Sequence, residues 1–149
     1  MAKEEILFLE NQLCFPLYVA SRLTTRAYTP LLDELGLTYP QYLVMLALWE
    51  KDQQVVGELS KRLYLDYNTL TPLLKRLEEK GFIQRIRSQN DERSVQIHLS
   101  KEGIKLKTKA YCIPETLIES LQNSALSLEE LQQFKTTLNK LMKGLNQQD

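Results

Sequence analysis

The chain has 149 residues, 43% of them hydrophobic and 26% charged, which is enough for one compact domain and too short to expect two. Its apolar runs are far shorter than the roughly 20 residues of a membrane helix, and its first residues lack the pattern of a secretion signal. We therefore expect a cytoplasmic protein with no membrane partner. Its two cysteines are expected to be thiols whose role is chemical, rather than a structural disulfide.

The formal net charge is zero, but the charges are unevenly spread along the chain. Residues 61–93 carry eight Lys and Arg against five Asp and Glu, whereas residues 1–60 carry four against eight and residues 94–149 carry seven against six. Because a DNA-binding surface needs positive charge on one face only, this basic middle third keeps DNA binding open.

The first predicted helix begins near Asn11, a candidate cap, and runs to about residue 27 or beyond, with Pro16 in its first turn. Thr38 and Gln41 then have the spacing of a capping box. The helix that follows them is apolar nearly all round, so we expect it at the centre of the domain.

Two amphipathic helices are predicted next. The first covers residues 55–63, and the second begins at Asp66 or Asn68 and ends near Lys80. One face of the second helix is apolar and the opposite face is polar. The apolar face has leucines at the i, i+3, i+4 and i+7 positions, namely Leu70, Leu73, Leu74 and Leu77.

The periodicity then changes from that of a helix to that of a strand. Residues 82–86 form a short apolar stretch, and Val95, Ile97 and Leu99 alternate with polar residues. The intervening segment 87–93 is polar and turn-rich, which predicts a β-hairpin with a long charged tip. Two short helices followed by such a hairpin are typical of a winged helix-turn-helix, whose second helix enters the major groove of DNA.

Two further helices are predicted after the hairpin. Ser100 caps a helix to about residue 122, with a kink expected at Pro114, and Ser127 and Glu130 form a second capping box that opens the final helix. The terminal helices have apolar stripes that a winged helix does not need for its own core. A second copy of the chain is the simplest partner for these stripes.

The predicted fold is therefore mainly α, a winged helix-turn-helix with a small β-hairpin wing and dimerisation helices at both ends. We expect a single domain over residues 1–149, with dimerisation helices at about 6–35 and 101–146 and the winged helix-turn-helix at about 38–100. The sequence contains no internal repeat, low-complexity segment or flexible linker that would divide it.

The polar face of the helix that ends near Lys80, together with the hairpin, is the candidate DNA-binding surface. Hydroxyls and long cations there can reach phosphates and base edges, and an arginine at the hairpin tip suits the narrow minor groove. Asp91 would hold the tip by pairing with a neighbouring arginine. The alternative is an ordinary solvated helix face. The candidate residues are Asn68, Thr69, Thr71, Pro72, Lys75, Arg76, Arg85, Arg87, Asp91 and Arg93.

An ordinary enzyme is disfavoured. The one histidine, His98, lies on the polar face of the second hairpin strand and is better explained as a solvated residue than as a metal ligand. The sequence has no glycine-rich phosphate loop, no nucleotide fingerprint and no Ser/His/Asp set. We expect neither a metal nor a cofactor.

Cys14 is expected near the start of the first helix, where unpaired backbone N–H groups and the positive end of the helix dipole favour a thiolate and so reactivity toward peroxides. The alternative is a small buried hydrophobe, the commoner role of a lone helical cysteine. The same alternative holds for Cys112, and Tyr28 and Tyr39 are by default core or rim aromatics.

Residues 65–103 resemble the recognition helix and wing of the MarR family of bacterial regulators; their sequence is LDYNTLTPLLKRLEEKGFIQRIRSQNDERSVQIHLSKEG. The organic hydroperoxide resistance repressors of that family are similar in the stretches LTYPQYLVMLALWE and QLCFPLYVASRLTTRAYTPLL, so the resemblance covers nearly the whole chain. It implies a homodimer with interlocked terminal helices, which binds double-stranded DNA at an inverted-repeat operator.

The resemblance also implies a sensing cysteine, here Cys14, which organic hydroperoxides oxidise and whose thiolate is hydrogen-bonded by Tyr28 and Tyr39 of the partner subunit. A sulfenic acid, followed by a disulfide or further oxidation, would shift the recognition helices and release DNA. Cys112 is a candidate resolving cysteine, and a low-molecular-weight thiol is the alternative. Residues 67–68 are Tyr-Asn where the subfamily usually has a small pair, which implies an altered base preference.

Two other functions stay open at this point. A repressor of the same family would be released by a small aromatic or phenolic ligand bound between the dimer helices and the DNA-binding lobe, and that ligand would raise its thermal stability. A thiol peroxidase that uses Cys14 would instead turn over hydroperoxide with a thiol reductant.

Overall fold

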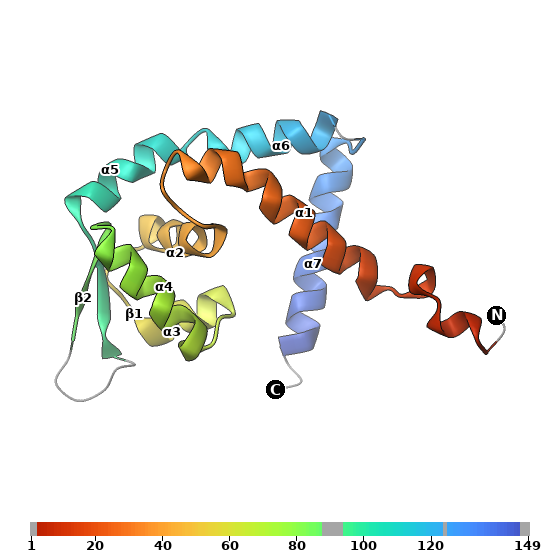
Figure 1. The fold of residues 1–149 in the computed structure, drawn as a ribbon, viewed down its shortest axis with the longest axis horizontal. Coiled ribbons are helices and arrows are strands. Elements are labelled where there is room, and N and C mark those ends of the chain that lie inside the picture. The colour runs from red at the N-terminus through yellow and green to blue at the C-terminus, as the bar shows by residue number, and fades with distance from the viewer. Residues whose placement is uncertain (1–2, 88–93, 124, 147–149) are drawn as a thin grey trace. The chain divides into compact units, whose positions relative to one another are not determined.

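The computed structural model describes residues 3–87, 94–123 and 125–146 and is mainly helical with one small sheet (Figure 1). The elements in chain order are two short 3-10 turns, η1 (Glu5–Leu7) and η2 (Leu9–Asn11), then α1 (Cys14–Asp33), α2 (Tyr39–Glu50), β1 (Gln54–Val55), α3 (Val56–Leu63), α4 (Tyr67–Glu79), β2 (Ile83–Ile86), β3 (Gln96–Leu99), α5 (Lys101–Ala110), α6 (Ile113–Asn123) and α7 (Leu128–Asn146). The expected winged helix-turn-helix, formed by α3, α4 and the β2–β3 hairpin, is confirmed.

The chain forms two compact units, Met1–Tyr111 and Cys112–Asp149. The first unit contains helices α1 to α5 and the sheet. The described part of the second unit consists of α6 and α7. None of the helices in the described ranges is long and apolar enough to cross a membrane.

Helix α2 is the centre of the first unit, as the sequence predicts. Its residues Val44, Met45 and Leu48 are almost fully buried, and α1, α3, α4 and α5 all pack against it. The capping box is confirmed, because Thr38 Oγ1 accepts from the Gln41 N–H while Gln41 Oε1 accepts from the Thr38 N–H at 3.1 Å. A helix that is apolar on all sides is thereby fixed at its N-terminus and covered along its length.

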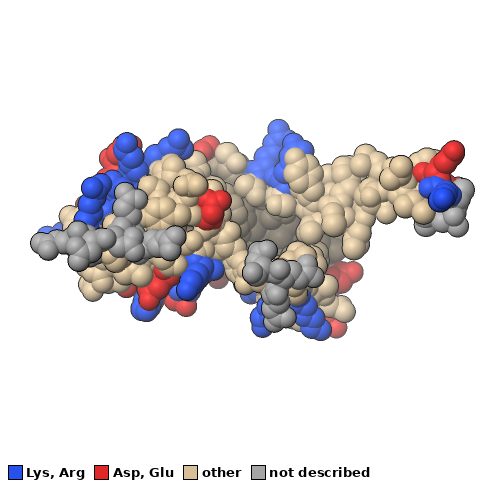
Figure 2. All heavy atoms as spheres, turned by 90° about the horizontal axis from the view of Figure 1, so that it is seen from below, with Lys and Arg blue, Asp and Glu red and all other residues tan. Residues whose placement is uncertain are grey.

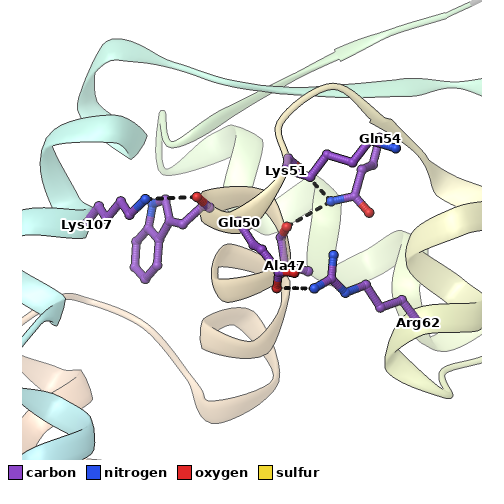
Figure 3. Close-up of polar contacts among 7 residues, drawn as sticks. Ala47, Glu50, Lys51, Gln54, Arg62 and Lys107 are labelled. Carbon is purple, nitrogen blue, oxygen red and sulfur yellow. Dashed lines mark hydrogen bonds and ion pairs between the residues drawn. The ribbon is translucent and has the colours of Figure 1, made fainter.

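The C-terminal end of α2 is held by side chains from three other segments (Figure 3). The buried Gln54 donates from Nε2 to two backbone carbonyl oxygens at this end, and the ammonium of Lys107 on α5 donates to the Trp49 carbonyl oxygen. Arg62 on α3 forms an ion pair with Glu50. The last carbonyl groups of a helix have no partner within it, and the hydrogen bond from Lys107 satisfies one of them. The contacts of Gln54 and Arg62 fix the same end of α2.

The sheet has three antiparallel strands in the order β1-β3-β2. β2 and β3 form the predicted hairpin, in which Ile83 pairs with Leu99. Ile83 and Ile97 are buried, which places the apolar face of the hairpin on the core. The sequence analysis did not predict β1, because two residues are too few to show a strand periodicity.

Helix α5 begins directly after β3 and packs closely against the start of the hairpin. Ser100 caps it, as predicted, by accepting the Gly103 N–H at 3.0 Å. A Cβ at position 103 would lie 2.1 Å from the Phe82 carbonyl oxygen, so only glycine permits this approach. The Trp49 indole N–H donates to the Gly103 carbonyl oxygen at 2.9 Å and ties α5 to α2.

Two local predictions were wrong. Asn11 does not cap α1; it belongs to η2, its side chain donates to a backbone carbonyl oxygen of η1, and the helix begins at Cys14 and continues to Asp33. The helix expected from residue 101 to about 122 is two helices, α5 and α6, separated at residues 111–112. Pro114 lies in the first turn of α6, where a helix tolerates proline, rather than at a kink.

In the second unit, the predicted capping box before α7 is confirmed, since Ser127 and Glu130 exchange hydrogen bonds between their backbone N–H groups and side-chain oxygens. No described residue of α7 is buried. Phe134, Leu141 and Leu145, which belong to its apolar stripe, are 50%, 45% and 58% exposed. The amphipathic face that the sequence predicts is therefore formed but not covered within the described part of the second unit.

Candidate DNA-binding surface and redox site

Helix α4 presents most of the candidate DNA-binding residues on the side away from the core. Asp66, rather than Asn68, caps the helix by accepting the Thr69 N–H at 2.8 Å. On the opposite face of α4, Leu70, Leu74 and Leu77 are buried in the core of the first unit. The exposed residues of the outer face are Asn68, Thr69, Pro72, Lys75 and Arg76.

The polar groups of Thr71 and Arg85 have partners within the described residues. The half-buried Thr71 donates its hydroxyl to the Tyr67 carbonyl oxygen at 2.9 Å. Arg85 on β2 donates to the carboxylate of Glu78 on α4 through its backbone N–H at 2.9 Å and through Nε at 2.8 Å. The pair fixes β2 against α4, and a contact of either candidate with DNA stays a prediction.

Glu78 is a residue of this surface that the sequence analysis missed. Partial burial alone would raise its pKa, but the hydrogen bonds from Arg85 and the charges of Arg85 and Arg87 outweigh burial and hold the pKa of Glu78 below its ordinary value. The sequence signal that could have identified Glu78 is its position as an acidic residue inside a basic segment, where its carboxylate attracts a neighbouring cation.

Arg87 is exposed just beyond β2, where it is available for DNA. The other predicted residues of the wing tip, Asp91 and Arg93, lie outside the described residues. Figure 2 shows Lys and Arg side chains around the winged-helix end of the first unit, with acidic side chains among them. The basic excess of residues 61–93 in the sequence falls largely on α3, α4 and β2, the elements of the winged helix.

Cys14 is the first residue of α1 and is exposed. Leu13 occupies the cap position, and among the described residues no side chain accepts the first N–H groups of this helix. The Phe15 N–H donates to the Gln12 carbonyl oxygen and Pro16 has no N–H, so the positive end of the α1 dipole, rather than a set of free N–H groups, lies next to the sulfur. The alternative of a buried small hydrophobe does not hold for Cys14 within one chain.

Tyr28 and Tyr39 are brought together near the junction of α1 and α2, where Tyr42 joins them. The ring centroids of Tyr28 and Tyr39 are 4.8 Å apart, and those of Tyr28 and Tyr42 are 5.9 Å apart. Burial, with a smaller effect of the neighbouring tyrosines, raises the pKa of Tyr28 to about 12, and burial also raises the pKa of Tyr39. Both hydroxyls therefore stay protonated at neutral pH and act as hydrogen-bond donors.

Cys14 and Tyr28 lie on the same helix, 14 residues apart in sequence. A rise of 1.5 Å per residue separates them by about 21 Å along α1. Because Tyr39 packs on Tyr28, it is similarly far from the Cys14 of its own chain. Neither tyrosine can therefore contact the Cys14 sulfur of its own chain.

Cys112 is exposed and begins the second unit. Its carbonyl oxygen accepts from the N–H and the hydroxyl of Thr116 in the first turns of α6. No disulfide joins the two cysteines of the chain.

His98 is half-buried on β3, and its Nε2 lies 2.8 Å from Gln96 Oε1. Within the described ranges, no group of three or more His, Cys, Asp or Glu could hold a metal ion.

Known proteins resemble the whole chain. The sequence model of the family described as transcriptional regulator SarA/Rot matches residues 26–110. The organic hydroperoxide resistance transcriptional regulator of Bacillus subtilis strain 168 is 50% identical over 141 residues, which cover 95% of this chain and 94% of that protein.

Two solved structures of AbfR, a protein of Staphylococcus epidermidis, are similar over nearly their full length. Reduced AbfR bound to DNA has a TM-score of 0.74 at 38% identity and covers 99% of this chain and 98% of its own. Disulfide-formed AbfR has a TM-score of 0.59 at the same 38% identity and covers 94% and 96%. The similarity thus includes proteins solved both on DNA and in an oxidised state.

Proposed function

Because this chain belongs to the organic hydroperoxide resistance regulators of the MarR family, we propose that it is a cytoplasmic repressor that senses organic hydroperoxides through the Cys14 sulfur. The reduced homodimer binds an inverted-repeat operator with its winged helices, and oxidation releases it. The observation that carries this proposal is the position of Cys14, an exposed thiol at the uncapped N-terminus of α1.

The sensing step is a two-electron oxidation of sulfur. The Cys14 thiolate attacks one oxygen of the hydroperoxide, an S–O bond forms as the O–O bond breaks, and the other oxygen leaves as an alkoxide that takes a proton to become the alcohol. The sulfur becomes a sulfenic acid and the peroxide is reduced. The positive end of the α1 dipole favours the thiolate before this reaction.

The sensing site is completed by a second chain. Tyr28 lies about 21 Å along α1 from the Cys14 of its own chain, and Tyr39 packs on Tyr28, so these two tyrosines reach a Cys14 sulfur only in the partner subunit. The uncovered apolar side chains of α7 and of the first turns of the chain, including Leu7, Leu13 and Phe134, supply surface for such a dimer. Loss of the tyrosine hydrogen bonds on oxidation then disturbs the dimer and the spacing of its recognition helices.

The sulfenic acid is consumed by a second thiol. Attack of that thiol on the Cys14 sulfur forms a disulfide and expels water. The thiol is either Cys112, which is exposed, or a low-molecular-weight thiol. Non-reducing electrophoresis distinguishes these two thiols. A disulfide to Cys112 of the partner subunit would give a covalent dimer, whereas a disulfide to a small thiol would leave a monomer heavier by the mass of that thiol.

A gel-shift experiment on a palindromic site beside the chain's own gene tests the proposal. Wild-type protein is expected to bind tightly, with affinity that falls steeply with salt, and to release the site on treatment with an organic hydroperoxide. Cys14→Ser is expected to bind equally well and to stay bound after treatment. Release of Cys14→Ser by peroxide would show that the sensing assignment is wrong.

A ligand-released repressor is the second candidate, and one feature favours it. A pocket of about 300 Å³ lies between the second half of α1 and the first turn of α2, and Tyr39 is part of its lining. An aromatic or phenolic ligand there would raise the melting temperature and release DNA without peroxide. Repeated turnover of hydroperoxide with a thiol reductant would instead indicate a thiol peroxidase.

A further inference from the structure

Lys80 joins the ends of three helices at one point. It is the C-terminal cap residue of α4, and its ammonium donates to the Gly36 carbonyl oxygen, beyond the end of α1, and to Gln41 Oε1, in the first turn of α2, at 2.9 Å. Gly36 and Gln41 lie on either side of Tyr39 in the sequence. The recognition helix is therefore tied to the segment that carries this tyrosine.

Both acceptors of Lys80 are held in place by contacts of their own. Gln41 is 1% exposed, and its Oε1 also accepts the Thr38 N–H that closes the capping box. Gly36 has a φ of 67°, and the N–H of the residue after it donates back to a carbonyl oxygen of α1. A displacement of either helix end therefore moves an acceptor of the Lys80 ammonium.

We propose that Lys80 is a positioning residue that transmits the oxidation state of the Cys14 site to the recognition helix. The inference rests on the proposed function, because it requires Tyr39 to donate to the thiolate of the partner's Cys14. Loss of that hydrogen bond on oxidation displaces the first turn of α2, and the Lys80 ammonium carries the displacement to the C-terminal end of α4. The direct packing of α2 on α4 provides the remaining coupling.

The fold does not depend on this ammonium. Without it, Gln41 Oε1 keeps its hydrogen bond from Thr38, and the exposed Gly36 carbonyl oxygen is accessible to water. Helix α4 keeps its Asp66 cap and its buried leucines. Lys80→Met, which preserves the aliphatic part of the side chain, therefore separates coupling from folding.

The test compares the operator Kd of reduced and peroxide-treated protein at one salt concentration. For Lys80→Met, the ratio of oxidised to reduced Kd is expected to fall about fivefold relative to wild type, while the Kd of the reduced form changes by less than about threefold. The rate of Cys14 oxidation, followed by mass spectrometry, is expected to stay unchanged. Lys80→Arg, which keeps a cationic donor, is expected to restore most of the ratio.

Lys101→Met is the matched control, because Lys101 is exposed at the start of α5 and its ammonium has no acceptor shown among the described residues. It removes the same charge and is expected to leave the ratio at the wild-type value. If Lys80→Met loses its structure by circular dichroism, Lys80→Gln is measured in the same way.

One result for Lys80→Met would overturn the inference. A ratio that matches wild type, whether or not both redox forms bind more weakly, would assign Lys80 a structural role only. If wild-type protein itself keeps its operator after Cys14 is oxidised, the proposed function fails together with this inference, so the two failures are distinguishable.

Discussion

The winged helix and the terminal helices of this chain differ in how far a single copy completes them. In α4, the leucines of the apolar face are buried, the N-terminus is capped by Asp66, and the wing is fixed to the helix by Glu78 and Arg85. In α7, by contrast, the apolar stripe is formed but no described residue is buried. One chain thus completes the packing of its winged helix, whereas the apolar stripe of α7 has no cover within the second unit.

The proposed redox site follows the second pattern. Cys14 is exposed at one end of α1, whereas the proposed donor Tyr28 lies about 21 Å away along this helix and the second proposed donor, Tyr39 of α2, packs on Tyr28. In the proposed arrangement, the candidate DNA-binding residues of α4 lie within one chain and the sensing residues are brought together between chains. Oxidation would then act on the contact between the copies and so control DNA binding.

The largest expected effect comes from breaking the unfinished surface. Phe134→Asp places a charge in the exposed apolar stripe of α7 and should convert the dimer to a monomer. Loss of simultaneous binding to both half-sites then lowers operator affinity by about 10²- to 10⁴-fold. Sedimentation and gel shift measure the two effects, and Gln133→Asp, on an exposed polar neighbour, is the control. A dimeric Phe134→Asp protein would contradict the assignment of this stripe.

A smaller effect is expected on the rate of Cys14 oxidation when a proposed tyrosine donor is removed. Tyr39→Phe removes the hydroxyl proposed to donate to the Cys14 thiolate of the partner subunit. The rate of Cys14 oxidation should fall about tenfold, the factor for loss of one hydrogen bond to a charged group worth about 1.5 kcal/mol. Stopped-flow or mass-spectrometric kinetics check the rate, and Tyr111→Phe, at a 66% exposed tyrosine, should match wild type. Unchanged kinetics in Tyr39→Phe would remove Tyr39 from the site.

In the winged helix, removal of an exposed cation and removal of an internally paired cation are expected to change the salt dependence of DNA binding differently. Lys75 is exposed on α4 and is expected to contact a phosphate, so Lys75→Ala should reduce the steepness of the salt dependence by about one unit of log Kd per log salt. Arg85 is paired with Glu78, so Arg85→Ala should weaken binding with the salt dependence nearly unchanged. Titrations at several salt concentrations measure both slopes. Equal slopes for the two variants would contradict this distinction.

The smallest expected effect concerns the stability of the finished region. The folded-state pKa of Glu78 lies below its ordinary value of 4.5, so the carboxylate stabilises the winged helix above that pH, and the contribution is lost as the pH falls through the folded pKa. Glu78→Gln should lower the free energy of unfolding by about 0.5 kcal/mol at pH 7 and by less at pH 3. Urea titrations at both values measure this, with the exposed Glu79→Gln as the control. An equal loss at both pH values would show that the charge is irrelevant.

Periodicity and capping explain which parts of the fold were predictable from the sequence. The leucine spacing of α4, the alternation of β3 and the caps at Thr38, Ser100 and Ser127 are local signals, and each is present in the structure. The break between α5 and α6 was misplaced because Pro114 permits either a kink or a helix start.

The site residues divide in the same way. Cys14 at a helix start and the outer face of α4 follow from local patterns. The Glu78 to Arg85 pair and the Lys80 to Gln41 hydrogen bond join different elements, the second across 39 positions, and no periodicity predicts them. The raised pKa of Tyr28 likewise arises from burial among Tyr39 and Tyr42, which only tertiary packing creates.

The proposed arrangement combines Cys14 of one chain with Tyr28 and Tyr39 of the other in each sensing site. It is tested most directly in heterodimers that pair a Cys14→Ser chain with a chain carrying Tyr28→Phe and Tyr39→Phe, by measuring the rate of oxidation of the one remaining Cys14. A site shared between chains leaves that cysteine facing intact tyrosines, so oxidation is expected at the wild-type rate. Oxidation as slow as in the homodimer of the double tyrosine variant would contradict the account.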